Sequence, residues 1–154
     1  MTAGRLIVIV ILGVTVLFGA ALWWFVVRAY YERVDLNVLP ITLASGAEID
    51  LALDAAQAID ADTSPLRFRA CFGLSGEILE RFQSDAMAYD TPTPLTAPRW
   101  FNCFDAEAIG SALEAGEAQA YLATREIARG VDRVVAIFPD GRGYAWTQLN
   151  GTLE

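Results

Sequence analysis

The segment that decides the fold is Asp132-Arg133-Val134-Val135-Ala136-Ile137-Phe138-Pro139-Asp140-Gly141-Arg142-Gly143-Tyr144-Ala145-Trp146-Thr147-Gln148-Leu149. Apolar, β-branched and aromatic residues dominate both halves, and Pro139-Asp140-Gly141-Arg142 separates them with residues that adopt tight-turn backbone angles at low cost. The pattern predicts an antiparallel hairpin of two strands, over 132–138 and 143–149.

The segments before this hairpin alternate between strand and helix patterns. We expect strands over 117–127 and 66–74, a strand-like alternation over 49–54, and an edge strand over 38–44, where Pro40 cannot donate a backbone hydrogen bond. Two helices are expected, one over 76–82 with Ser75 as N-cap and one over 106–115 between Asp105 as N-cap and Gly116 as terminator. The sum is an α+β domain with two helices on an antiparallel sheet of four or five strands.

The N-terminal region is apolar in a different way. Residues 6–27 form a run of 22 residues without a charge. At about 1.5 Å per residue this run spans roughly 33 Å, enough to cross a hydrocarbon core of about 30 Å. Cationic and aromatic residues at its ends match a membrane interface. These interface residues are Arg5, Trp23, Trp24, Arg28, Tyr30 and Tyr31. We therefore expect a transmembrane helix over 6–28, with the lipid bilayer as its first partner.

A cleaved signal peptide is the alternative for this run. The only cluster of small residues is Gly19-Ala20-Ala21, and six large apolar residues follow it without a break. Cleavage there would leave an apolar N-terminus, so an uncleaved signal anchor is favoured. A five-residue tail stays inside easily, and long domains are translocated largely regardless of charge. The expected orientation is N-terminus in and domain out.

The charged residues exclude several kinds of chemistry. The chain has 154 residues and a net charge of −8, and all eleven basic residues are Arg, with no Lys and no His. Imidazole general bases, Ser-His-Asp triads, lysine Schiff bases and phosphorelay through histidine are therefore impossible. Residues 29–154 carry nine Arg and 19 acidic residues, a net charge of −10, which repels nucleic acid. No glycine motif suits a phosphate, so we expect no bound nucleotide. Because the sequence singles out no other catalytic motif, we also expect no cofactor and no enzymatic activity.

Three segments, 59–72, 100–106 and 130–146, resemble an uncharacterised family of short, single-pass membrane-anchored bacterial proteins, a domain of unknown function. The resemblance implies a bacterial inner-membrane protein and carries no catalytic residues to this chain. With the orientation above, it divides the chain into a cytoplasmic tail (1–5), the signal-anchor helix (6–28), a juxtamembrane connector (29–38) and a periplasmic α+β domain (39–150).

Cys71 and Cys103 are the only cysteines of the chain. They are too far apart for a redox Cys-x-x-Cys motif and too few for a zinc or iron–sulfur site. In an oxidising periplasm they predict one structural disulfide that closes a loop of about 33 residues. The alternative is two separately buried thiols.

Two further clusters are candidate ion sites. Arg67 and Arg69 share one face of the predicted strand, where they would either contact an anion or form cross-strand salt bridges, and the salt bridges are favoured. The oxygen-rich residues 60–64 lack the glycine and the distant glutamate of a calcium loop, so a solvated turn is favoured there. We expect no metal site.

The loop over 90–98 is the best candidate for partner contact. It contains Pro92, Pro94 and Pro98 and is followed by Trp100. Proline-rich extended segments present their backbone to a partner at low entropic cost. The alternative is an ordinary connector with Trp100 buried.

Two functions of different classes follow from these features. The first is a non-catalytic accessory or interaction component of a membrane or envelope assembly, whose protein partner the sequence does not name. The second is a membrane-tethered periplasmic domain that binds a ligand or an ion at Arg67 and Arg69 or at residues 60–64. An exposed apolar surface near the proline loop favours the first, and a concave pocket with converging polar groups favours the second.

Overall fold

The N-terminal apolar run forms one helix, α1 (Ala3–Trp24), which continues as a turn of π-helix, η1 (Phe25–Ala29). No residue of α1 is buried. By length and composition this helix is able to cross a membrane, as a membrane anchor or a signal sequence would. The computed structural model describes residues 3–153, apart from the side chain of Arg81. Met1 and Thr2 of the predicted cytoplasmic tail lie outside the described residues.

A second unit begins at Glu32 and contains an antiparallel sheet of six strands. The strand order is β1-β4-β5-β8-β7-β6. The strands are β1 (Glu32–Val34), β4 (Asp54–Asp60), β5 (Arg69–Gly73), β6 (Gln119–Ala128), β7 (Val131–Ile137) and β8 (Arg142–Leu149). The predicted hairpin forms the pair β7–β8, whose register runs from Val131 opposite Leu149 to Ile137 opposite Gly143.

A smaller hairpin of two strands, β2 (Val38–Thr42) and β3 (Glu48–Ala52), covers part of this sheet. The segment after helix α2 (Gly76–Asp85) connects the two sheets. The Met87 N–H donates to the Thr42 carbonyl (2.9 Å), and the Met87 carbonyl accepts from the Leu122 N–H of β6 (2.8 Å). The hydroxyl of Thr42 also donates to the Ala123 carbonyl (2.9 Å). The small hairpin is thereby fixed to the β6 edge of the main sheet.

The predicted α+β class and the antiparallel sheet are confirmed, but the main sheet has six strands rather than four or five. Two strands escaped prediction. The sequence of β4 is Asp-Ala-Ala-Gln-Ala-Ile-Asp, which has low intrinsic strand propensity, and its pairing with β5 supplies the conformation instead. Strand β1 has only three residues and lies inside the segment predicted as connector, so part of that segment belongs to the domain.

The two predicted helices are α2 (Gly76–Asp85) and α3 (Ala106–Ala115). The Asp105 side chain caps α3 by accepting hydrogen bonds from the backbone N–H groups of Glu107 and Ala108, both at 3.1 Å. Gly116 ends this helix in the left-handed conformation (φ 73°). Ser75 occupies the N-cap position of α2 as predicted, but its side chain makes no capping hydrogen bond.

This difference between the two caps predicts two unequal mutations. Asp105→Ala should lower the free energy of unfolding by about 1 kcal/mol, because two N–H groups of α3 lose their acceptor. Ser75→Ala is the matched control and should change it by less than about 0.5 kcal/mol. Urea unfolding followed by circular dichroism measures both. Equal losses would show that the observed capping bonds do not account for the stability of α3.

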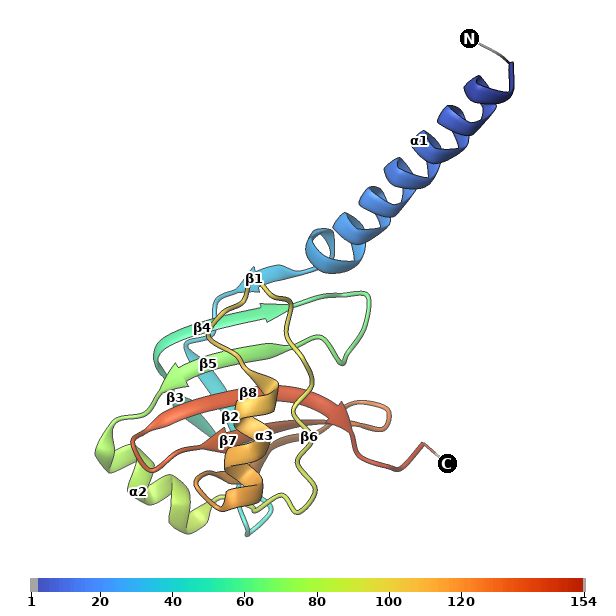
Figure 1. Ribbon diagram of the computed structural model, residues 1–154. Coiled ribbons are helices and arrows are strands. Elements are labelled where there is room, and N and C mark those ends of the chain that lie inside the picture. The colour runs from blue at the N-terminus through green and yellow to red at the C-terminus, as the bar shows by residue number, and fades with distance from the viewer. Residues whose placement is uncertain (1–2, 154) are drawn as a thin grey trace. The chain divides into compact units, whose positions relative to one another are not determined.

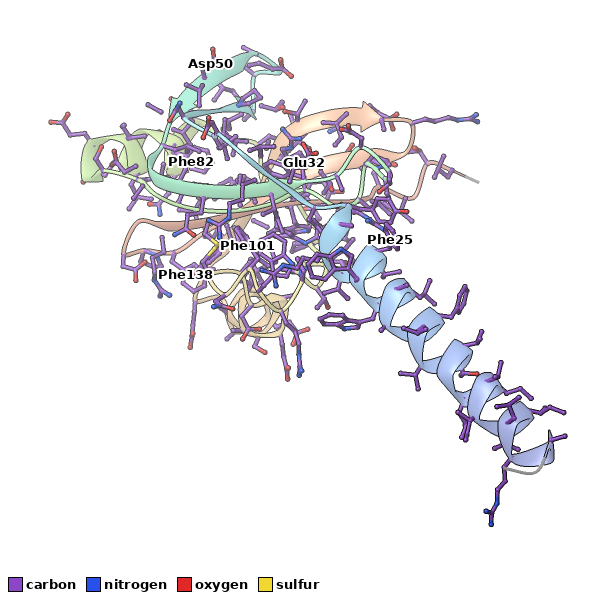
Figure 2. All side chains as sticks on the ribbon, turned by 90° about the horizontal axis from the view of Figure 1, so that it is seen from above. Phe25, Glu32, Asp50, Phe82, Phe101 and Phe138 are labelled. Carbon is purple, nitrogen blue, oxygen red and sulfur yellow. A yellow bond between two sulfur atoms is a disulfide. The ribbon has the colours of Figure 1, made fainter. Side chains whose placement is uncertain are left out.

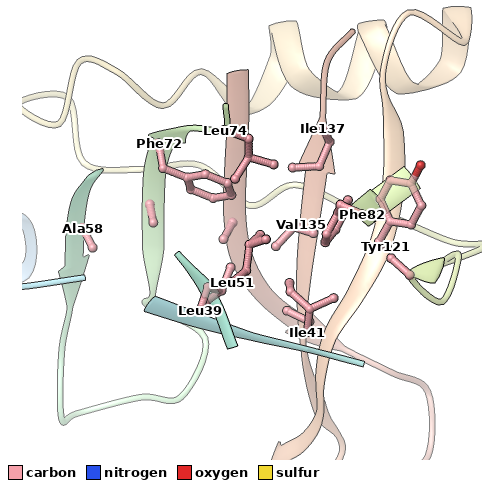
Figure 3. Packing of buried hydrophobic residues seen from close by; sticks show 14 of the residues in the cluster. Leu39, Ile41, Leu51, Ala58, Phe72, Leu74, Phe82, Tyr121, Val135 and Ile137 are labelled. Carbon is pink, nitrogen blue, oxygen red and sulfur yellow. The ribbon is translucent and has the colours of Figure 1, made fainter. Parts of the chain in front are cut away.

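Both faces of the main sheet are covered. In Figure 1, α3 crosses in front of the sheet while β2 and β3 lie behind it. On the β2–β3 side, Phe72, Val135 and Ile137 of the sheet pack against Leu39 and Ile41 of the hairpin (Figure 3). The opposite side carries the residues that the sequence singled out.

Candidate functional site

The disulfide joins the sheet to the segment that leads into α3. Cys71 lies in β5 and Cys103 lies two residues before the N-cap Asp105, and their Cα atoms are 6.2 Å apart (Figure 2, yellow bond). This separation is within the range of protein disulfides, so the predicted bond is confirmed and the alternative of two separate thiols is wrong. Phe104 follows directly and packs edge-on against Trp146 of β8 (6.4 Å between ring centroids).

The proline loop is held against the sheet by Gln148 of β8. The Gln148 Oε1 atom accepts hydrogen bonds from the Thr93 N–H (2.7 Å) and from the indole N–H of Trp146 (2.9 Å). Its Nε2 atom donates to the Thr91 carbonyl (3.0 Å). Trp146 and Gln148 are both buried, so this amide joins the loop to the core rather than to solvent. No motif in the sequence indicates this role of Gln148, although Gln148 lies on the same strand face as Trp146.

Arg69 holds the next part of the same loop. Its guanidinium donates to the Leu95 carbonyl (2.6 Å) and, more weakly, to that of Thr96 (3.4 Å). It also donates to the carbonyls of Leu66 (2.9 Å) and Phe68 (2.6 Å). The residue is only 3 % exposed. Arg69 therefore fastens the loop to the start of β5.

The predicted anion contact at Arg67 and Arg69 is wrong for Arg69. Its guanidinium is buried and donates to backbone carbonyls inside the fold. Arg67 precedes β5, which begins at Arg69, so the two arginines do not share a strand face. The alternation of apolar and charged residues in this segment predicted a strand with one exposed face. In the structure both faces of the sheet are covered.

A groove of about 660 Å³ lies between the proline loop and α3. We call it the α3 groove. Residues 90–94 form one wall and the α3 residues Glu107, Gly110 and Glu114 form part of the other. The lining includes the carboxylates of Asp90, Glu107 and Glu114 and no arginine.

The predicted contact residues divide between two environments. Pro92 and Pro94 line the α3 groove, whereas Pro98 and Trp100 do not. Trp100 is half-buried and packs edge-on against the buried ring of Phe101, with 6.3 Å between ring centroids. The structure thus brings two of the four predicted residues to one concave surface.

Comparison with known protein families identifies the family of this domain. Residues 38–154, from the start of β2 to the end of the chain, match the family of unknown function DUF6446. The chain belongs to this family. The predicted membership of an uncharacterised domain family is confirmed. No curated protein and no solved structure matches the chain.

The oxygen-rich turn of the DUF6446 domain, residues 60–64, is held by its own backbone. The Asp60 carboxylate accepts from the Ala61 N–H (2.8 Å), and the Ser64 hydroxyl accepts from the Leu66 N–H (3.3 Å). Asp62 and Thr63 are exposed. The Asp and Ser side chains of this segment thus hold its own backbone, as in the turn that the sequence favoured. Within residues 3–153, no three His, Cys, Asp or Glu side chains lie close enough together to hold a metal ion.

A second polar cluster of the DUF6446 domain was not predicted. Buried Asp132 accepts hydrogen bonds from the Glu126 N–H (2.9 Å) and the Asn150 side chain (2.9 Å), and Asn150 also donates to the Glu126 carboxylate (2.7 Å). Glu126 has a positive φ of 50°, which this network stabilises. The cluster joins the β6–β7 turn to the segment after β8. No sequence motif signals it, because its members are brought together only by the strand register.

The hydrogen bond from Asn150 holds the pKa of the Glu126 carboxyl below its ordinary value, with a further contribution from the Gly130 N–H. Glu126 therefore stabilises the folded state above the unfolded-state pKa, and this contribution is lost as the pH falls through the folded-state pKa. Asn150→Ala should raise the pKa of Glu126 and make stability less sensitive to acid. Carboxyl-carbon NMR titration measures the shift.

The control for this titration is Asp140, whose pKa is lowered by Arg142 in a different turn. Its titration should not change in the Asn150→Ala variant. An unchanged pKa of Glu126 would contradict the assignment.

Proposed function

We propose that this protein is a non-catalytic, single-pass inner-membrane protein whose periplasmic domain serves as an accessory component of an envelope assembly and binds a protein partner through the α3 groove. The observation that carries the proposal is the proline wall of this groove. Gln148 and Arg69 fix the backbone of residues 91–96 to the sheet. A wall held in this way contacts a partner without paying to order a mobile loop.

The membrane part of the proposal rests on α1 and on the disulfide. An apolar helix with no buried residue suits a lipid environment. The bond between Cys71 and Cys103 is typical of an oxidising compartment. The absence of a break in the apolar run after Ala21 supports an anchor that is retained rather than cleaved.

The alternative function, a ligand- or ion-binding domain, has less support. Its candidate residue Arg69 donates to backbone carbonyls inside the fold, and residues 60–64 form a turn closed by their own side chains. The α3 groove instead offers proline side chains beside exposed carboxylates, a combination that suits a protein surface. The lack of His and Lys in the chain further supports a role without acid–base turnover at neutral pH.

Fusions to the C-terminus test the orientation. Alkaline phosphatase fused after the last residue should be active in cells, and green fluorescent protein at the same position should be dark. The intact mass of the membrane-extracted protein should include the α1 segment. A fluorescent fusion with an inactive phosphatase would place the domain inside, and a mass without α1 would identify a cleaved signal peptide.

Site-specific photo-crosslinking in intact cells tests the groove. A crosslinking amino acid at Ser111, which is exposed on α3 in the groove, should give a discrete adduct, and one at exposed Thr63 in the β4–β5 turn should not. Charge reversal by Glu107→Lys with Glu114→Lys should abolish the adduct, with only the small loss of stability expected for a lysine in the first turn of α3. Equal adducts at both positions, or an adduct that survives charge reversal, would contradict the proposed surface.

A further inference from the structure

A second groove, of about 320 Å³, lies along β3 on the other side of the main sheet. We call it the β3 groove. Its lining includes four consecutive residues of β3, Ile49–Ala52, together with Ile78, Phe82 and Asp85 of α2. Consecutive strand residues point to opposite faces of a strand. A groove that all four line therefore runs along the edge of β3 and not under one of its faces.

This edge of β3 is open. Among residues 3–153, β3 is paired with β2 alone, and no other strand continues the small sheet beyond it. Figure 2 shows Asp50 of β3 at the periphery of the domain. An exposed strand edge presents a row of backbone donors and acceptors to any extended chain that aligns with it. The Ala44 N–H donates to the Asp85 carbonyl (2.8 Å) and holds the end of α2 beside the hairpin.

The side chains along the groove offer apolar contacts next to this edge. Ile49 is 42 % exposed, although it lies on the same side of the hairpin as the fully buried Ile41 opposite it. Its neighbours in the groove include Leu51 and Phe82, which are nearly buried. In a strand added at the edge, every second side chain would point to the face of Ile49 and cover it. Contacts of such alternate side chains are the source of specificity when a strand is added to a sheet.

The negative charges around the groove favour a cationic partner over a second copy of β3. Its lining contains the carboxylates of Asp50 and Asp85 and no arginine, and Glu48 of β3 is exposed nearby. A second copy of β3 would place Glu48 and Asp50 next to their own counterparts, and like charges on neighbouring strands destabilise pairing. A cationic chain would meet these carboxylates with favourable interactions instead.

We propose that the β3 groove binds an extended segment of another protein in which apolar and cationic side chains alternate, and that this segment adds to the small sheet as a strand beside β3. The apolar side chains contact Ile49 and the α2 residues Ile78 and Phe82, and the cations contact Asp50 and Asp85. This surface is separate from the α3 groove, so its failure would leave the proposed function untouched.

The probe for this site is a labelled nine-residue peptide that alternates valine and lysine, titrated by fluorescence anisotropy into the full-length protein in a neutral detergent. We expect saturable binding that weakens as salt increases. A peptide that alternates valine and glutamate should not bind. The valine–lysine peptide with N-methylated backbone amides should lose at least tenfold in affinity, because it cannot pair with a strand edge. Equal binding of the methylated peptide would overturn strand addition in favour of simple charge attraction.

Protein variants locate the peptide. Asp50→Lys with Asp85→Lys should weaken binding at least tenfold, whereas Asp62→Lys with Glu117→Lys, which makes the same charge change at exposed sites elsewhere, should change it less than threefold. Equal losses in the two double variants would overturn the assignment to the β3 groove. Sedimentation of the protein without peptide gives a further test. A dimer that the peptide dissociates would identify a second copy as the occupant and overturn the proposal.

Discussion

A variant in which both Cys71 and Cys103 are replaced by serine should lose about 3–4 kcal/mol of free energy of unfolding relative to the oxidised protein. The bond closes a loop over a sequence separation of 32 residues, and this loop contains α2 and the proline loop. In the chain-entropy model, breaking the bond raises the conformational entropy of the unfolded chain more than that of the folded chain, so the free energy of unfolding falls. Since a domain of this size has only about 5–15 kcal/mol of net stability, the loss should be large in a urea titration.

Reduction of the unmutated protein provides the control for this experiment. With an excess of a phosphine reductant, its unfolding midpoint should fall to that of the double-serine variant, and the variant itself should not respond. A variant as stable as the oxidised parent would contradict a stabilising role for the bond. A parent that does not respond to reductant would contradict the presence of the bond in the isolated protein.

Arg69→Met should lower the free energy of unfolding by about 2–4 kcal/mol. The change keeps an apolar stem of similar length but removes the donor to the carbonyls of Leu95, Leu66 and Phe68. Hydrogen bonds from a charged donor contribute about 1.5–3 kcal/mol each, and the gain from no longer burying a cation offsets part of that sum. A urea titration followed by tryptophan fluorescence measures the effect.

Arg99→Met is the matched control, because Arg99 is an exposed arginine of the same region. Its replacement should change stability by less than about 0.5 kcal/mol. Hydrogen exchange adds a readout that a general loss of stability would not produce. The Thr93 amide, which donates to Gln148 in the part of the loop next to Leu95, should lose protection in Arg69→Met more than the amides of β7. Similar effects of the two replacements would show that the carbonyl contacts of Arg69 are not stabilising.

The parts of the fold that were predictable are those with a local signal. The turn at Asp140 and Gly141 and the cap at Asp105 depend on residues close in sequence, and both are present as expected. Strand β4 depends on its partner β5, and nothing within its own sequence indicates it. The same distinction applies to the proline loop, whose position is set by Arg69 and Gln148 on strands far from it along the chain.

The error at Arg69 has a definite physical origin. A strand that alternates apolar and charged residues is typical of a sheet with one solvated face. In this protein α3 and the proline loop cover that second face, so a charge expected in solvent is instead buried against carbonyl groups. A single sequence contains no signal for the second layer, because that layer comes from residues 90–115 and not from the strand itself.

The strand order has a consequence for how the chain folds. Strands β6, β7 and β8 follow one another and pair as neighbours, whereas β5 pairs with β8, and α2, α3, β6 and β7 all lie between them in the chain. During synthesis β4 and β5 are made well before β8, and β5 cannot pair with its second partner until nearly the whole chain is complete. Contacts between such distant segments slow folding and leave a strand edge open in the meantime. From this topology we expect the C-terminal meander to form quickly and the N-terminal strands to complete the sheet by docking onto β8 last.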